Sequence, residues 1–168
     1  MPDIKNYYGT ATDNTITLAS LASDTTLVAG RQGTEVDNTV VRALDYLVSG
    51  KITTGTTPTV GSIELWAVAS YDILGTTYPD VITNAGDAAK TWTTAAIKSG
   101  AARLLWSQTV TTTSNIAYPF SGLSVAGVFN GTCPARWVPF VVHGTVAALN
   151  ATAANHLIRV LPVYGNVS

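Results

Sequence analysis

Apolar and polar residues alternate along much of this chain. Residues 15–19, in which Ile16 and Leu18 alternate with Thr15 and Thr17, show the alternation in its simplest form. It predicts a half-buried β-strand, because successive side chains of a strand point to opposite faces of the sheet. Longer runs rich in Thr, Val, Ile, Tyr and Trp predict further strands. These runs are residues 40–54, 62–71, 101–111, 117–129, 136–146 and 157–164.

Polar loops separate these strands, and the signals for helices are few. The pattern therefore predicts an all-β fold, an antiparallel β-sandwich of jelly-roll type. We expect at most one short helix, at residues 87–98, where Ala88, Trp92 and Ala95 fall near helical spacing. Proline cannot donate to a sheet ladder, so three prolines within the predicted strands indicate edges or bulges. They are Pro119, Pro139 and Pro162.

No linker of biased composition divides the chain, so we expect one domain at residues 14–168. The preceding residues 1–13 are polar and carry Ile4, Tyr7 and Tyr8. We interpret them as an N-terminal arm whose three apolar side chains could anchor it to a partner protein. The arm either adds to the sheet edge of a neighbouring molecule, or frays or pairs within its own subunit.

Charge is scarce in this sequence. Charged residues make up 11% of the chain, against about 25% in ordinary soluble domains. The net charge is -1, and no charged residue lies between Arg103 and Arg136. A surface with so little charge repels its own copies weakly, which favours self-association. We expect a subunit interface in this uncharged stretch, at its large aromatic side chains Trp106, Tyr118, Phe120 and Phe129.

Several classes of partner are disfavoured. The nine Lys and Arg residues form no basic stripe for nucleic acid. No apolar run approaches the length of about 18 residues that a membrane span needs. The first residues lack the apolar segment of a secretory signal, so we expect synthesis in a cytoplasm. Cys133 is the one cysteine, so no disulfide can form within the chain.

Candidate catalytic groups are few. His143 and His156 suggest a metal pair, but no third ligand follows from their spacing, and hydrogen-bonded histidines are the commoner case. Cys133 would need a nearby base, which the sequence does not predict. Asp72 and Asp80 could form a glycosidase pair, yet their loop is typical of turn aspartates. No cofactor fingerprint is present. We therefore expect no enzyme activity, cofactor or metal.

The chain has four tryptophans, Trp66, Trp92, Trp106 and Trp137. Tryptophans gathered on one exposed face would make a platform for sugar rings. Three of them fall inside predicted strands, where a place in the core or at a subunit interface is commoner.

Two groups of segments resemble a known class of proteins. They are Gly30-Arg31-Gln32-Gly33-Thr34-Glu35-Val36-Asp37-Asn38-Thr39 with residues 51–59 and 64–67, and Trp137-Val138-Pro139-Phe140-Val141-Val142 with residues 148–152 and 155–156. These segments are similar to small, Thr-rich virion structural proteins of tailed bacteriophages, and most like a capsid decoration (cement) protein. The resemblance implies a homotrimer on the outside of the capsid, bound to the major capsid protein. It also makes the arm with Ile4, Tyr7 and Tyr8 a candidate contact with the capsid.

Two other assignments stay open at this point. One is a carbohydrate- or receptor-binding module of a head or tail fibre, and the other is a tail or neck component. The number of copies per particle separates them, since a decoration protein approaches the abundance of the major capsid protein.

Overall fold

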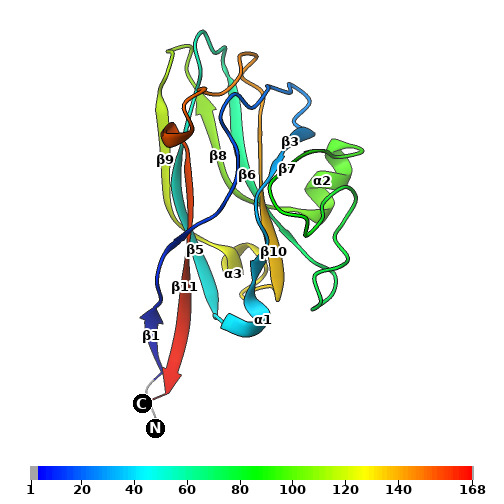
Figure 1. The fold of residues 1–168 in the computed structure, drawn as a ribbon, viewed down its shortest axis with the longest axis vertical. Helices are drawn as coiled ribbons and strands as arrows, with labels where there is room; N and C mark the ends of the chain where they lie inside the picture. Colours follow the sequence, from blue (N-terminus) through cyan, green and yellow to red (C-terminus); the bar gives the residue numbers. More distant parts are fainter. Residues whose placement is uncertain (1–3, 168) are drawn as a thin grey trace.

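The computed structural model describes residues 4–167, which form two facing antiparallel β-sheets (Figure 1). The first sheet has the order β1 (Ile4–Tyr8), β11 (Leu157–Val167), β5 (Asp45–Thr53) and β9 (Ala117–Ser124), with β2 (Thr12–Asp13) also beside β11. The second has the order β7 (Ala88–Thr91), β3 (Ala29–Gln32), β10 (Arg136–His143), β6 (Gly61–Ala69) and β8 (Arg103–Val110), with β4 (Val36–Asp37) also beside β10.

The strand order is that of a jelly roll. Leaving aside β2, β4 and β7, the described strands number eight in chain order. The first sheet joins the first, eighth, third and sixth of them, and the second sheet joins the second, seventh, fourth and fifth. The chain therefore crosses repeatedly from one sheet to the other, as the two Greek keys of a jelly roll require. The predicted all-β sandwich is confirmed.

The core lies between the two sheets. Alternate side chains of β5 and β6 point inward, among them Val48, Ile52, Ile63 and Leu65, and all four are buried. Strand β10 is buried on both faces, because residues 70–102 cover the outer face of the second sheet and form a second apolar cluster around Trp92. Burial on both faces explains the continuous apolar run in the sequence of β10.

The predicted strand at residues 15–19 is wrong. This segment belongs to the loop between β2 and β3 and joins neither sheet. Only Leu18 is buried there, and the loop is shaped by Asp24, whose carboxylate accepts hydrogen bonds from the backbone of Thr26, Val28 and Ala29. Alternation alone predicted a strand, but no partner strand lies beside it.

The predicted helix at residues 87–98 is also wrong in extent. Its first part is β7, and the helix, α2 (Ala95–Ala101), begins only after Thr94, whose hydroxyl accepts a hydrogen bond from Ile97 N. Two four-residue helices were not predicted, α1 (Asn38–Val41) and α3 (Val125–Val128), and η1 (Ala153–Asn155) is one 3-10 turn. Side chains of Asp37 and Ser124 cap α1 and α3, a contact typical of helix starts.

The three prolines lie where the ladder is open. Pro119 belongs to β9, an edge strand, as predicted. Pro139 and Pro162 lie in the central strands β10 and β11, but each faces a break in its neighbour. Pro162 lies opposite residues 9–11, between β1 and β2, and Pro139 lies opposite residues 33–35, between β3 and β4. A missing N–H therefore costs no ladder bond at either proline.

Candidate functional site

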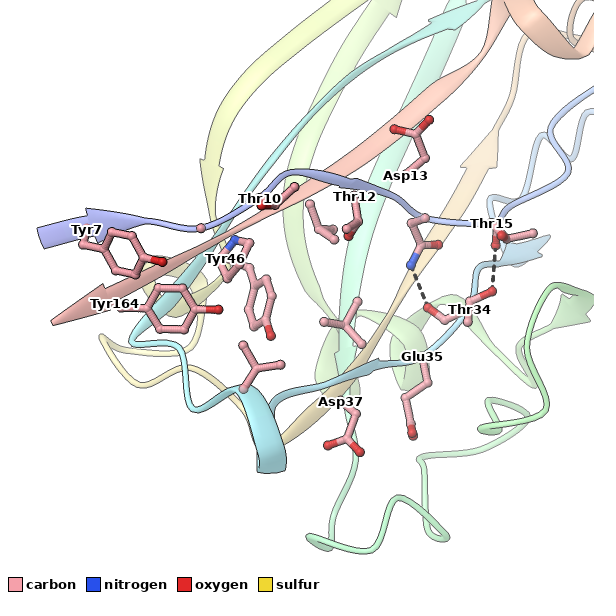
Figure 2. Close-up of a pocket in the computed structure, with 16 residues that line it drawn as sticks. Tyr7, Thr10, Thr12, Asp13, Thr15, Thr34, Glu35, Asp37, Tyr46 and Tyr164 are labelled. Atoms are coloured by element: carbon pink, nitrogen blue, oxygen red, sulfur yellow. Dashed lines mark hydrogen bonds between the residues drawn. The ribbon is translucent and has the colours of Figure 1, made fainter.

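A groove of about 500 Å³ opens between the edges of the two sheets (Figure 2). One wall is the N-terminal segment from Tyr7 to Thr15 on β11, and the other is the segment from Thr34 to Asp37 with the end of α1. The two breaks that face Pro139 and Pro162 lie on these two walls. The groove therefore follows from the fold, because residues 9–11 interrupt the pairing with β11 on the same side of the sandwich where residues 33–35 interrupt the pairing with β10.

Three tyrosines line the groove. Tyr7 of β1 stacks on Tyr164 of β11, with ring centroids 5.2 Å apart and an interplanar angle of 26°. Figure 2 shows their hydroxyl ends turned toward Tyr46. Tyr46 of β5 is only 3% exposed, and its hydroxyl has no hydrogen-bond partner among residues 5–165. Burial raises the pKa of Tyr46 to about 12, so its hydroxyl stays protonated and able to donate at neutral pH.

The carboxylates of the groove are held by arginines. Arg136 Nη1 donates to Glu35 Oε1 at 2.6 Å, and Arg136 Nη2 lies 2.8 Å from Asp37 Oδ2. Glu35 also accepts a hydrogen bond of 2.6 Å from the Tyr78 hydroxyl. On the other wall, Arg159 Nε donates to Asp13 at 2.6 Å.

These contacts favour ligand binding over acid catalysis. The hydrogen bond from Arg159 lowers the pKa of Asp13, and the hydrogen bond from the Thr39 hydroxyl lowers the pKa of Asp37. A general acid at neutral pH needs a raised carboxyl pKa instead. Both carboxylates are therefore suited to accept hydrogen bonds and poorly suited to deliver a proton.

Apolar side chains are exposed at the end of the sandwich that carries α1. Val40 is 83% exposed and Leu44 56% exposed. The loop after β6 lies at the same end (Figure 1) and exposes Ile73 and Leu74. Arg136 joins the two parts, because it pairs with the α1 cap Asp37 and donates from Nε to Ile73 O at 2.8 Å. We call Val40, Leu44, Ile73 and Leu74 the apolar end.

The residues predicted for a subunit interface pack largely inside the molecule. Phe120 is buried, which corrects its assignment to a subunit surface, and the half-buried Trp106 contacts it with ring centroids 4.9 Å apart. Tyr118 and Phe129 are half-buried against the same core. These aromatic rings close the sandwich between β8 and β9, where its two sheets have free edges.

The N-terminal arm is a strand of its own domain. Residues Ile4–Tyr8 pair with β11 of the same chain, so the second of the two alternatives for the arm, pairing within its own subunit, is what the fold contains. Tyr7 lines the groove, whereas Tyr8 is not part of its lining. Both rings are more than half exposed. The side chain of Ile4 lies outside the described residues.

Both histidines serve structural hydrogen bonds. His143 is fully buried, with Nε2 3.0 Å from Leu21 O and Nδ1 3.0 Å from the Thr145 hydroxyl. His156 Nε2 lies 2.8 Å from Asn150 O. Burial raises the pKa of the Cys133 thiol to about 12, so it carries almost no thiolate at neutral pH. In the part of the chain that the structure describes, no three His, Cys, Asp or Glu side chains gather as a metal site.

Asp72 and Asp80, the two candidate glycosidase residues, each make hydrogen bonds to a different threonine. Asp72 accepts hydrogen bonds from Thr76 in its own turn, and Asp80 accepts from the backbone and hydroxyl of Thr93. Hydrogen bonds from Thr77 and Thr76 lower the pKa of Asp72 to about 2. Each aspartate shapes its loop, as is usual for turn aspartates.

The tryptophans form no exposed platform. Trp66, Trp92 and Trp137 are buried, and Trp106 is half-buried against Phe120. The aromatic surface that is open to solvent consists of tyrosines instead. No pattern in the sequence predicted the groove, because its lining comes from three separate parts of the chain, residues 7–15, 34–46 and 160–164, that only the fold brings together.

Comparisons with known proteins give no relative: no family model, no curated protein and no solved structure matches this chain. Among residues 4–167, no helix has the length and apolar character needed to cross a membrane.

Proposed function

We propose that this chain is a structural protein of a tailed-phage particle, a capsid decoration protein that binds and stabilises the shell of the major capsid protein. The observation that carries the proposal is the apolar end of a domain with very little charge. Large exposed apolar side chains that lie together mark contact surfaces. The resemblance of the sequence to phage virion proteins gives the identity of the partner.

The apolar end is held in place by the fold. Asp37 caps α1, Asn38 exchanges two side-chain hydrogen bonds with the backbone of Ala43, and Leu44 N donates to Val163 O of β11 at 2.7 Å. Val40 and Leu44 therefore project from a braced turn. A preorganised apolar surface loses little conformational entropy on binding, which favours stable attachment.

Self-association is the second part of the proposal, and the free edge of β8 is its best support. Three of the four sheet edges carry a residue that discourages strand addition: Lys5 in β1, Lys90 in β7 and Pro119 in β9. Strand β8 begins with the exposed Arg103, but from Leu104 to Val110 it carries no charged residue and no Pro. We expect a homo-oligomer, with the trimer implied by the resemblance, whose subunits meet along this edge.

The fold does not separate a decoration protein from a tail or neck component, so the number of copies decides between these locations. Quantitative mass spectrometry of purified particles should find this chain at an abundance close to that of the major capsid protein. A few copies per particle would contradict the decoration role and favour a fibre, tail or neck component.

The attachment surface is tested with particles from which this protein has been removed. A Val40→Ser/Leu44→Ser variant should fold, because both side chains are exposed, and should bind at least about tenfold more weakly through lost apolar contact. Val60→Ser is the matched control, since Val60 is 68% exposed and lies in the loop between β5 and β6. Equal binding by the double variant and the intact chain would contradict attachment through the apolar end.

A further inference from the structure

We propose that the groove between the two sheet edges binds a neutral saccharide ring. This inference does not rest on the capsid role. The groove adjoins the apolar end at α1, but none of the four residues of the apolar end lines it. A volume of about 500 Å³ lies within the range of about 300–1,000 Å³ that is usual for small-molecule sites. The lining combines flat aromatic rings with many hydroxyl and carboxylate groups.

The aromatic wall gives the ligand its first contact. Tyr7 is 59% exposed although it stacks on Tyr164, so a face of this aromatic pair is open to solvent at the groove. The C–H face of a sugar ring packs well on an aromatic face, which carries partial negative charge. Gly9 lets the N-terminal segment cross close to Tyr164, because a Cβ at this position would lie 2.8 Å from the Tyr164 ring.

The base of the groove supplies a donor that lacks a partner. Tyr46 is buried, yet its hydroxyl bonds to none of the residues from 5 to 165, and Figure 2 shows it directed into the groove. Tyr46 Oη is not among the fully enclosed polar atoms that lack a partner, so solvent can satisfy it in the free protein, and a ligand oxygen can take the place of that solvent. The hydroxyls of Thr10, Thr12 and Thr15 line the same space and offer both donors and acceptors.

The charges of the groove favour a neutral ligand. Asp13, Glu35 and Asp37 outnumber their two arginine partners, because Arg136 is shared by Glu35 and Asp37, so the groove would repel an anion. Each carboxylate already has a guanidinium nitrogen within 2.8 Å, which leaves a cation no unpaired carboxylate to bind. Carboxylates fixed in this way still accept hydrogen bonds from sugar hydroxyls, and such charge-assisted bonds are stronger than neutral ones. A neutral polyhydroxylated ring uses every kind of group that the groove presents.

Saturation-transfer NMR on the full chain tests the proposal. The probes are the methyl glycosides of glucose, galactose, mannose, rhamnose and N-acetylglucosamine, each at millimolar concentration. We expect at least one glycoside to receive saturation, and Tyr7→Ala to weaken its binding at least tenfold. Tyr46→Phe removes one hydrogen bond and should weaken binding about three- to tenfold.

Tyr8→Ala is the matched control. Tyr8 follows Tyr7 in the same strand and has the same exposure within 1%, 58% against 59%, but it does not line the groove. We expect this variant to bind the glycoside as the intact chain does. Because Tyr7 is largely exposed, Tyr7→Ala should fold even if the buried Tyr46→Phe does not.

Two results would overturn the proposal. One is the absence of saturation transfer to all five glycosides. The other is an equal effect of Tyr7→Ala and Tyr8→Ala on glycoside binding. Neither result bears on capsid attachment, which is measured on particles with variants of the apolar end. Loss of particle binding in the Val40→Ser/Leu44→Ser variant, with glycoside binding retained, is the result expected if the two surfaces act separately.

Discussion

Buried polar side chains hold the long loops against the sandwich through hydrogen bonds. Gln32 is fully buried in β3, and its amide donates to the carbonyls of Thr83 and Gly86 and accepts from Thr83 N. Lys98 of α2 is buried over Trp66, with Nζ 2.6 Å from Leu27 O. Because such groups are costly to bury without partners, each contact fixes where its loop lies.

Lys98 provides a test at the scale of one ion pair. Its Nζ lies 2.9 Å from Glu64 Oε2, which also accepts from Trp66 Nε1. Lys98→Met leaves the Glu64 carboxylate without its cation and should lower the free energy of unfolding by about 3 kcal/mol, as for other buried pairs. Lys98→Met with Glu64→Gln should lower it less, because no unpaired charge is then buried. Urea denaturation of both variants measures the difference, and a larger loss in the double variant would contradict this account.

The two histidines predict a loss of stability in mild acid. Burial lowers the pKa of both His143 and His156 in the folded chain below the usual value of about 6.5. Below pH 6.5 the unfolded chain therefore binds more protons, so the free energy of unfolding should fall as the pH drops from 7 to 5. The slope is at most about 1.4 kcal/mol per pH unit for each histidine.

The carboxylates do not obscure this window. The pKa values of Asp13, Asp37, Asp72 and Asp87 in the folded chain lie below the usual 3.8. The stability that these carboxylates contribute is therefore lost only at lower pH. His143→Gln should keep a donor for Leu21 O and flatten the dependence between pH 7 and 5. Denaturation at several pH values is the measurement. A free energy that stays constant from pH 7 to 5 in the intact chain would show that the histidines do not titrate differently on folding.

At the scale of elements, the sequence predicted strands best where a run of β-forming residues also found a partner. The runs at 62–71, 101–111 and 157–164 became β6, β8 and β11 with small shifts at their ends. Residues 15–19 have the same alternation but no adjacent strand. The predicted helix at residues 87–98 is instead a strand followed by a helix. Asp87 pairs with Arg31 just before the strand, and Thr94 caps the start of the helix.

The groove marks the limit of sequence reasoning. Pro139 and Pro162 indicated two interruptions, and Tyr7 and Tyr8 indicated an aromatic segment. The sequence could not show that both interruptions lie on one side of the sandwich, since that depends on the pairing of β1 with β11 and β3 with β10. It also could not show that Tyr46 would lie at the base of the groove.

The free edge of β8 gives the prediction at this scale. Ser107 is exposed in β8, and Ser107→Lys adds the kind of charge that guards β1 and β7. We expect sedimentation to show a smaller species for this variant than for the intact chain. Ser121→Lys is the matched control, because Ser121 is exposed in β9, whose edge already carries Pro119. If Ser107→Lys sediments as the same oligomer as the intact chain, the subunit contact does not lie along the edge of β8.

At the scale of the whole molecule, charge is sparse, at 11% of the residues. The described ion pairs hold Arg31, Lys98, Arg136 and Arg159 against carboxylates of the same chain. Exposed ion pairs contribute little in any case. With a net charge of -1, the molecule has little long-range field to draw in a charged surface. We therefore expect the proposed attachment to rely on apolar contact and hydrogen bonds.

This distribution of charge predicts how particle binding responds to salt. Raising NaCl from 50 to 500 mM shortens the screening length several-fold, yet the Kd of the full chain for particles stripped of it should change less than about threefold. Sodium sulfate, which strengthens apolar association, should tighten binding instead. The Val40→Ser/Leu44→Ser variant is the control, because with part of its apolar surface removed it should gain less from sulfate. A loss of binding of more than about tenfold in NaCl would mean that charges such as Lys5, Arg42 or Lys51 contact the partner, as in electrostatically driven complexes.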